Sequence, residues 1–111
     1  PWVESARLLP EGVAVGTQIG YAVEVRGSTV LVGAHHDDHF GTDSGAAYLY
    51  EKDAASGWIQ TSKLYNPGSF GGDQFGAAAA IAGGGTIVVG ARYDDDDGPD
   101  SGSIYVFEPS P

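Results

Sequence analysis

Short apolar runs separated by glycine-rich and aspartate-rich segments recur along the whole chain. Residues 29–33 and 86–90 show no polar alternation, which predicts strands that are buried on both faces. Residues 46–51 and 103–108 also place apolar side chains on both faces. Residues 58–64 carry polar side chains in their interior, as is typical of a strand at an exposed sheet edge. The pattern therefore predicts an all-β chain.

The chain is an internal duplication. Trp2 aligns with Trp58 at an offset of 56 residues. Beyond an extra glycine in residues 83–85 the offset becomes 57, and Thr29 then aligns with Thr86. A repeat of this length suits a propeller blade better than a helical solenoid unit.

Each repeat offers four strand candidates, and together they predict one blade. The alanine run at residues 77–80 is too short to nucleate a helix and belongs to a strand. Sheets that are covered on both faces and end in a polar outer strand predict β-propeller-type blades, with a β-sandwich as the alternative. The candidates are residues 19–25, 29–33, 46–51 and 58–64, which repeat at 75–82, 86–90 and 103–108 and, before the first blade, at 2–8.

The strand candidates at the two ends of the sequence belong to incomplete blades. Residues 1–9 contain an outer strand for another blade, residues 19–65 a full blade, and residues 75–108 a blade that lacks its outer strand. We therefore predict two four-stranded antiparallel sheets, in which the N-terminal strand completes the C-terminal blade within the chain or in a neighbouring copy. A homo-oligomer or additional blades are expected, because two blades leave apolar faces open. The expected interface residues are Trp2, Leu8, Tyr105 and Phe107.

Three motifs resemble the FG-GAP repeat: Phe75-Gly76, Gly90-Ala91, and residues 102–107 (Gly-Ser-Ile-Tyr-Val-Phe). This repeat builds the β-propeller of integrin α subunits and of many extracellular proteins. The resemblance covers essentially the whole chain, twice. It implies an integrin-like β-propeller, a role in cell adhesion, and an extracellular or cell-surface location. The first copy is looser, since Ile19-Gly20 replaces Phe-Gly.

The calcium cage of integrin repeats does not transfer to this chain. It lies between the first two strands of each blade, where residues 26–28 and 83–85 carry no carboxylate. Aspartates instead lie between the second and third strands, where carboxylates around a glycine turn could bind Ca²⁺. The alternative is that these aspartates cap backbone N–H groups in turns. The candidate calcium ligands are Asp94, Asp96, Asp100, Asp37 and Asp43.

The acidic charge balance of the chain disfavours two classes of binding partner. Lys and Arg number 5 against 15 Asp and Glu, which gives a net charge of −10. This charge disfavours nucleic acid and anionic membrane surfaces. No apolar run approaches the ~18 residues of a membrane span, and no signal-peptide pattern occurs. Because the chain starts at Pro1 rather than methionine, removal of a leader or of part of a longer precursor is one expectation.

The catalytic signals are weak. The chain has no cysteine and no Gly-x-Ser-x-Gly motif. The histidine-rich residues 35–39 could bind a transition metal, but we favour a solvated loop, because adjacent side chains on an extended segment point to opposite faces. We therefore predict no enzyme, but a structural or adhesive module that contacts protein partners through an acidic loop face. The alternatives are a glycan-binding propeller that uses Trp2 or Trp58, and then a metal-dependent hydrolase.

Overall fold

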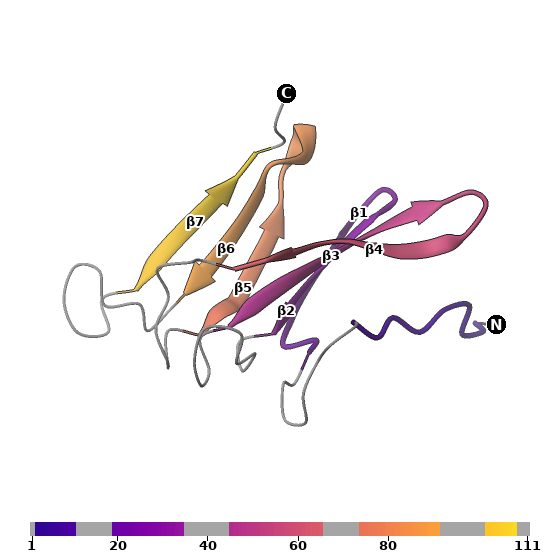
Figure 1. Ribbon diagram of the computed structural model, residues 1–111, viewed down its shortest axis with the longest axis horizontal. Coiled ribbons are helices and arrows are strands. Elements are labelled where there is room, and N and C mark those ends of the chain that lie inside the picture. The colour runs from indigo at the N-terminus through magenta and orange to yellow at the C-terminus, as the bar shows by residue number, and fades with distance from the viewer. Residues whose placement is uncertain (1, 11–18, 35–44, 66–73, 92–101, 109–111) are drawn as a thin grey trace.

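The chain forms two antiparallel β-sheets that pack against each other (Figure 1). The computed structural model describes residues 2–10, 19–34, 45–65, 74–91 and 102–108. The first sheet has the order β1-β2-β3-β4 and the second the order β5-β6-β7. The strands are β1 (Ala22–Arg26), β2 (Thr29–Ala34), β3 (Ala46–Asp53), β4 (Gly57–Leu64), β5 (Phe75–Ile81), β6 (Ile87–Ala91) and β7 (Ser103–Phe107).

Tight turns make each sheet a meander of neighbouring strands. Gly27, with φ 59°, lies in the turn between β1 and β2. Between β3 and β4 the backbone N–H of Ala55 donates a hydrogen bond of 2.8 Å to Oδ1 of Asp53. Such Asx contacts compensate the backbone where the chain reverses. The predicted all-β fold with propeller-type blades is confirmed, and the alanine run lies in β5 as predicted.

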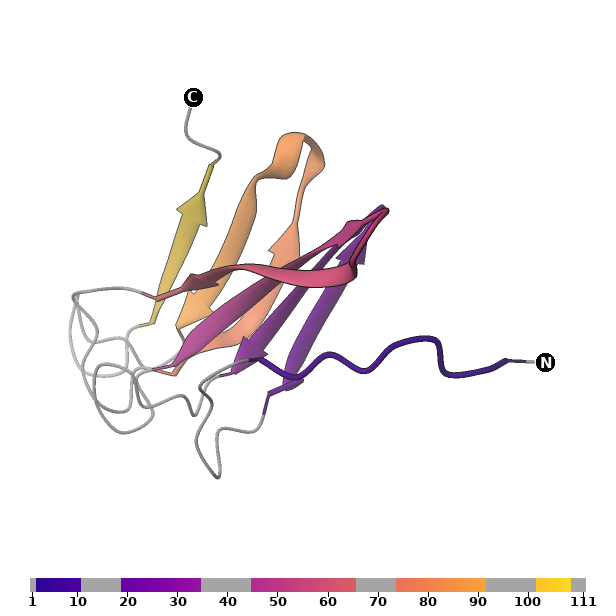
Figure 2. The same ribbon diagram turned by 45° about the vertical axis from the view of Figure 1, so that its right-hand side comes forward.

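The N-terminal segment differs from its predicted strand conformation. Residues 2–10 form no strand, and β7 has no fourth strand beside it among the described residues. A strand needs a partner edge to satisfy its backbone groups. In Figures 1 and 2 this segment lies on the side of the first sheet, away from β7. Within one chain, residues 2–10 therefore do not pair with the edge of β7. Completion by a neighbouring copy stays a prediction.

The main core lies between the two sheets. We call it the inter-sheet cluster, and strand β5 contacts β1, β2 and β3 across it. Apolar burial of this kind is the main stabilising term in folding. Its buried members are Leu31, Ala47, Phe75, Ile87, Val89 and Ala91.

A second core lies on the opposite face of the first sheet, and we call it the outer cluster. Leu31 faces the inter-sheet cluster while its neighbour Val32 faces the outer cluster, so β2 is buried on both sides. The prediction that the uninterrupted apolar pattern of β2 reflects burial on both faces is confirmed. The buried members are Val32, Ala34, Ala46, Tyr48 and Tyr50.

Candidate protein-interaction surface

The two sheets meet most closely where the chain enters β5. Phe75 is fully buried and forms an isolated parallel bridge with Gly45. A Cβ on Gly45 would overlap the backbone of Phe75, and one on Gly33 would overlap the carbonyl oxygen of Gly76. Glycine at these positions lets two backbones approach more closely than any side chain would allow. We call the surface formed by Gly33, Gly45 and Ala47 the filled seat, because Phe75-Gly76 occupies it.

Aromatic contacts hold Phe75 from the other side. Its ring lies 5.4 Å from that of Tyr105, at an interplanar angle of 59°. It lies 6.0 Å from the ring of Phe107 in an edge-to-face arrangement at 89°. Both geometries are favourable for aromatic quadrupoles. Two of the four expected interface residues, Tyr105 and Phe107, are thus half-buried within the chain, on the side of the second sheet that faces the first.

The far face of the second sheet is open and apolar. The side chains of Ile104 and Val106 are 74% and 60% exposed. Their repeat equivalents are Ala47, which is fully buried, and Leu49, which packs against the inter-sheet cluster. The same blade surface is therefore covered in the first repeat and uncovered in the second.

The first sheet shows the complementary exposure on its outer side. Val23 and Val25 are each 60% exposed. Their repeat equivalents, Ala79 and Ile81, pack against the inter-sheet cluster. Each sheet therefore exposes the face that its repeat equivalent buries.

The N-terminal segment is partly fixed and partly exposed. Leu8 is half-buried against the outer cluster, whereas Trp2 is fully exposed. The repeat equivalent of Leu8 is Leu64, which packs against the inter-sheet cluster. Leu8 therefore packs on a different cluster from its repeat equivalent, and residues 2–7 before it are exposed.

The two tryptophans have different surroundings despite their equivalent positions in the repeat. Trp58 is half-buried against the outer cluster, and Nζ of Lys52 lies 5.8 Å from the centre of its ring. This cation–π contact covers one face of the ring. Trp58 is therefore occupied by packing, which weakens the prediction that it stacks on a sugar.

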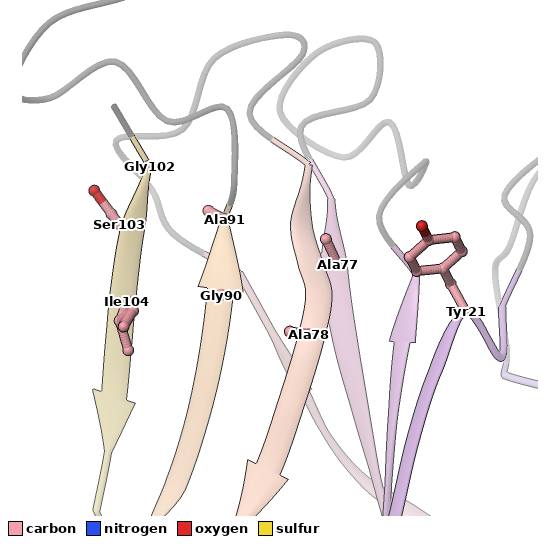
Figure 3. Close-up of a pocket in the computed structure, with 8 residues that line it drawn as sticks. All are labelled: Tyr21, Ala77, Ala78, Gly90, Ala91, Gly102, Ser103 and Ile104. Carbon is pink, nitrogen blue, oxygen red and sulfur yellow. The ribbon is translucent and has the colours of Figure 1, made fainter. Parts of the chain in front are cut away.

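A hollow of about 690 Å³ lies over the far face of the second sheet (Figure 3). Strands β5 and β6 and the start of β7 line it, and Tyr21, which directly precedes β1, lies across from them. Apart from Tyr21 and Ile104 its lining residues are small, so it fits a close backbone contact. The lining consists of Tyr21, Ala77, Ala78, Gly90, Ala91, Gly102, Ser103 and Ile104.

The predicted metal sites lie outside the described residues. This holds for Asp37, Asp43, Asp94, Asp96 and Asp100 and for the histidine-rich segment, so these sites stay predictions. Among the residues that the structure does describe, no group of three or more His, Asp or Glu side chains could hold a metal ion. The strand ends that lead into the aspartate segments lie together, since Ala34 pairs with Ala46, and Ala91 pairs with both Ser103 and Phe75.

Comparison with protein families finds the FG-GAP repeat at residues 2–50 and again at residues 58–107. The chain belongs to the FG-GAP repeat family. The two matches coincide with the two halves of the internal duplication, so the resemblance seen in the sequence is confirmed. No curated protein matches the sequence.

Membership of the FG-GAP family carries two general expectations. The family is generally non-catalytic and typically extracellular. In the described part of the chain, no helix is long and apolar enough to cross a membrane. That Gly33 and Gly45 receive Phe75-Gly76 was not predicted from the sequence. The available signal was that Gly33, Gly45 and Gly76 all recur at equivalent positions of the other repeat.

Proposed function

We propose that this FG-GAP chain is a non-catalytic structural or adhesive module of the β-propeller type. It mediates protein–protein interaction by packing its open sheet faces against copies of itself or against further blades. One observation carries the proposal. The exposed residues Val23, Val25, Ile104 and Val106 all have repeat equivalents that pack in the inter-sheet cluster.

The size of the exposed apolar surface supports this function. Fully burying one Val or Ile side chain is worth about 1.5–3 kcal/mol. Ile104 and Val106 are adjacent on one face of β7, beside the apolar hollow. Contiguous exposed apolar surface of this kind usually marks an interaction site.

The charge distribution suggests a second contact. The aspartate segments leave both sheets from the same end, where the strand ends pair. We infer that this acidic loop face contacts cationic surfaces of protein partners outside the cell. The net charge of −10 also makes copies repel one another.

The proposal is tested by the solution mass of the chain across a concentration series. The mass should rise above 11.4 kDa with concentration. The rise should be steeper at about 1 M salt than at about 0.01 M, because the Debye length falls from about 30 Å to about 3 Å. Ile104→Asp should reduce association. Ala55→Asp, which adds the same charge in the turn between β3 and β4, should not. A mass that stays at the monomer value under all conditions would contradict self-association.

A further inference from the structure

We propose that the hollow in Figure 3 is the docking site for Ile19-Gly20 of a second copy of this chain, which packs head to tail on the second sheet. The inference rests on the proposed function and names its partner and its contact. It is carried by the comparison of the hollow with the filled seat.

The hollow is the repeat equivalent of the filled seat. Gly33, Gly45 and Ala47 form the filled seat, and their repeat equivalents Gly90, Gly102 and Ile104 line the hollow. The occupant of the filled seat is Phe75-Gly76, whose repeat equivalent is Ile19-Gly20. Within one chain Ile19-Gly20 lies on the first sheet, so only another copy can bring it to the hollow.

The two glycines Gly33 and Gly90 have similar surroundings in their own sheets but differ in what lies across from them. A Cβ on Gly33 would lie 3.2 Å from Cβ of Ala22 and would overlap Gly76 of the other sheet. A Cβ on Gly90 would lie 3.5 Å from Cβ of Ala78, and among the residues that the structure describes the other atom within 4 Å is the carbonyl oxygen of Ala78. Gly90 therefore has the same kind of neighbour within its own sheet as Gly33, but among the described residues no backbone packs on it from another sheet.

Gly20 already has the conformation of a docked residue. Its φ is 95°, close to the 99° of Gly76. A Cβ on Gly76 would overlap the carbonyl oxygen of Ala46 across the junction, whereas one on Gly20 would meet no atom of the described residues within 4 Å. The N–H of Gly20 donates a hydrogen bond of 3.2 Å to the carbonyl oxygen of Gly33, which fixes this segment on its own sheet. The incoming segment is thus preorganised for a close contact.

The N-terminal segment supplies a second contact in the same docking. Leu64 pairs with Ala47 and Ser62 with Leu49. The repeat places Leu8 of the second copy opposite Ile104, and Ala6 opposite Val106. This pairing adds a fourth strand to the free edge of β7, as in β-augmentation.

A cation–π contact in the first sheet supports the same pairing of the N-terminal segment with β7. In the first sheet Nζ of Lys63 lies 5.3 Å from the centre of the Tyr48 ring. The equivalent pair across the copies is Arg7 over Tyr105, a further cation–π contact. In the single chain the described ion pair of Arg7 is with Glu4, and its guanidinium nitrogen lies 3.0 Å from Oε1 of that residue. Both side chains are exposed to solvent. An exposed ion pair of this kind is weak and is easily exchanged.

The contact is heterologous, because the surface on one copy differs from that on the next. Repetition therefore closes into a ring or continues as a filament, depending on the rotation between copies. The test does not depend on which of these forms.

The first experiment uses Gly90→Ala. Its Cβ meets ordinary contact distances in the single chain, so the urea midpoint of the dilute chain should be unchanged or slightly raised. In the assembly the same Cβ would overlap the backbone of Gly20, so association measured by light scattering should weaken at least tenfold. Gly33→Ala is the matched control: it fills the seat inside the chain and should lower the urea midpoint instead.

The second experiment tests the register by cross-linking. The chain has no native cysteine, so Ala6→Cys and Val106→Cys can be introduced in separate chains and mixed under oxidising conditions. Directly opposed residues in an antiparallel pair lie about 4.5–5.5 Å apart, within disulfide range. Cross-linked heterodimers are expected from this mixture. The control mixture, Ala6→Cys with Ile104→Cys, is displaced by two residues and should cross-link far less.

The outcomes separate the inference from the function on which it rests. Association of the wild type, lost in Gly90→Ala and accompanied by selective cross-linking, supports both. Association that survives Gly90→Ala and shows no selective cross-linking overturns the docking site but leaves self-association standing. A wild type that stays monomeric overturns the second copy as the occupant of the hollow.

Discussion

Phe75→Ala tests whether the junction between the two sheets holds the fold together. Phe75 is fully buried in the inter-sheet cluster, and its ring contacts Tyr105 and Phe107. Replacing it with alanine removes the group that fills the space between the sheets. It leaves the close backbone approach at Gly76 unchanged, so the effect reports on packing alone.

The magnitude follows from burial. Truncating a buried Phe to Ala costs about 3–5 kcal/mol, because the transfer free energy is lost and a cavity remains. The two aromatic contacts account for roughly 0.5–1.5 kcal/mol each within that sum. A domain of this size is stable by roughly 5–15 kcal/mol in total. Phe75→Ala should therefore remove a large part of the free energy of unfolding.

The assay is urea unfolding of the dilute chain, followed by tryptophan fluorescence. With a slope of about 2 kcal/mol per molar urea, the midpoint should fall by about 1.5–2.5 M. Phe75→Leu keeps most of the volume and should cost less, about 1–1.5 kcal/mol. The matched control is Ile104→Ala on the exposed face of the same sheet, which should change stability by no more than about 0.5 kcal/mol.

The reasoning would be refuted by equal effects at the two positions. If Phe75→Ala shifted the free energy of unfolding by less than about 1 kcal/mol, its side chain would not fill a tight core. The two sheets would then be held together by something other than this junction.

Two further predictions rest on the same geometry, and a third rests on the aspartate segment in the sequence. Gly45→Ala should destabilise the chain by more than about 2 kcal/mol in urea unfolding, because its Cβ would overlap the Phe75 backbone. Gly57 also has a positive φ, but no atom of the described residues lies within 4 Å of a Cβ built on it. Gly57→Ala should therefore cost about 1 kcal/mol, and losses equal to those of Gly45→Ala would contradict the overlap. Trp58→Ala should lower thermal stability by about 2–3 kcal/mol, while Trp2→Ala should leave that of the dilute chain unchanged; a loss at Trp2 would show that it packs in the single chain. Titration of Ca²⁺ in a calorimeter should give heat that a triple Asp-to-Asn variant abolishes, and a silent wild type would favour turn-capping aspartates. The three positions are Asp94, Asp96 and Asp100.

The architecture of each blade was predictable from local pattern. The runs around Leu31 and Val88 lack polar alternation, which predicts burial on both faces. The repeat then turned separate strands into units, because matches at one offset identify equivalent positions. For this reason the strand order and the antiparallel pairing followed from the sequence without any long-range information.

The interaction surface was predictable only in part. Tyr105 and Phe107 were expected at an interface, and the structure places them at the one inside the chain, where they contact Phe75. Trp2 and Leu8 were expected in a strand, yet residues 2–10 form none. A strand signal in the sequence records the preference of the segment, but pairing depends on whether a free edge lies within reach.

Apart from residues 2–8, the sequence by itself determined which described residues form strands, which of these strands neighbour one another in a sheet, and which positions in the two repeats are equivalent. These properties follow from short-range periodicity and from turn chemistry. Only the tertiary structure decided which of two equivalent faces is covered. Leu49 and Val106 are equivalent in the repeat, yet Leu49 packs in the inter-sheet cluster whereas Val106 is exposed. Burial depends on what lies on the other side of the sheet, and two positions that are equivalent in a repeat need not face the same neighbour.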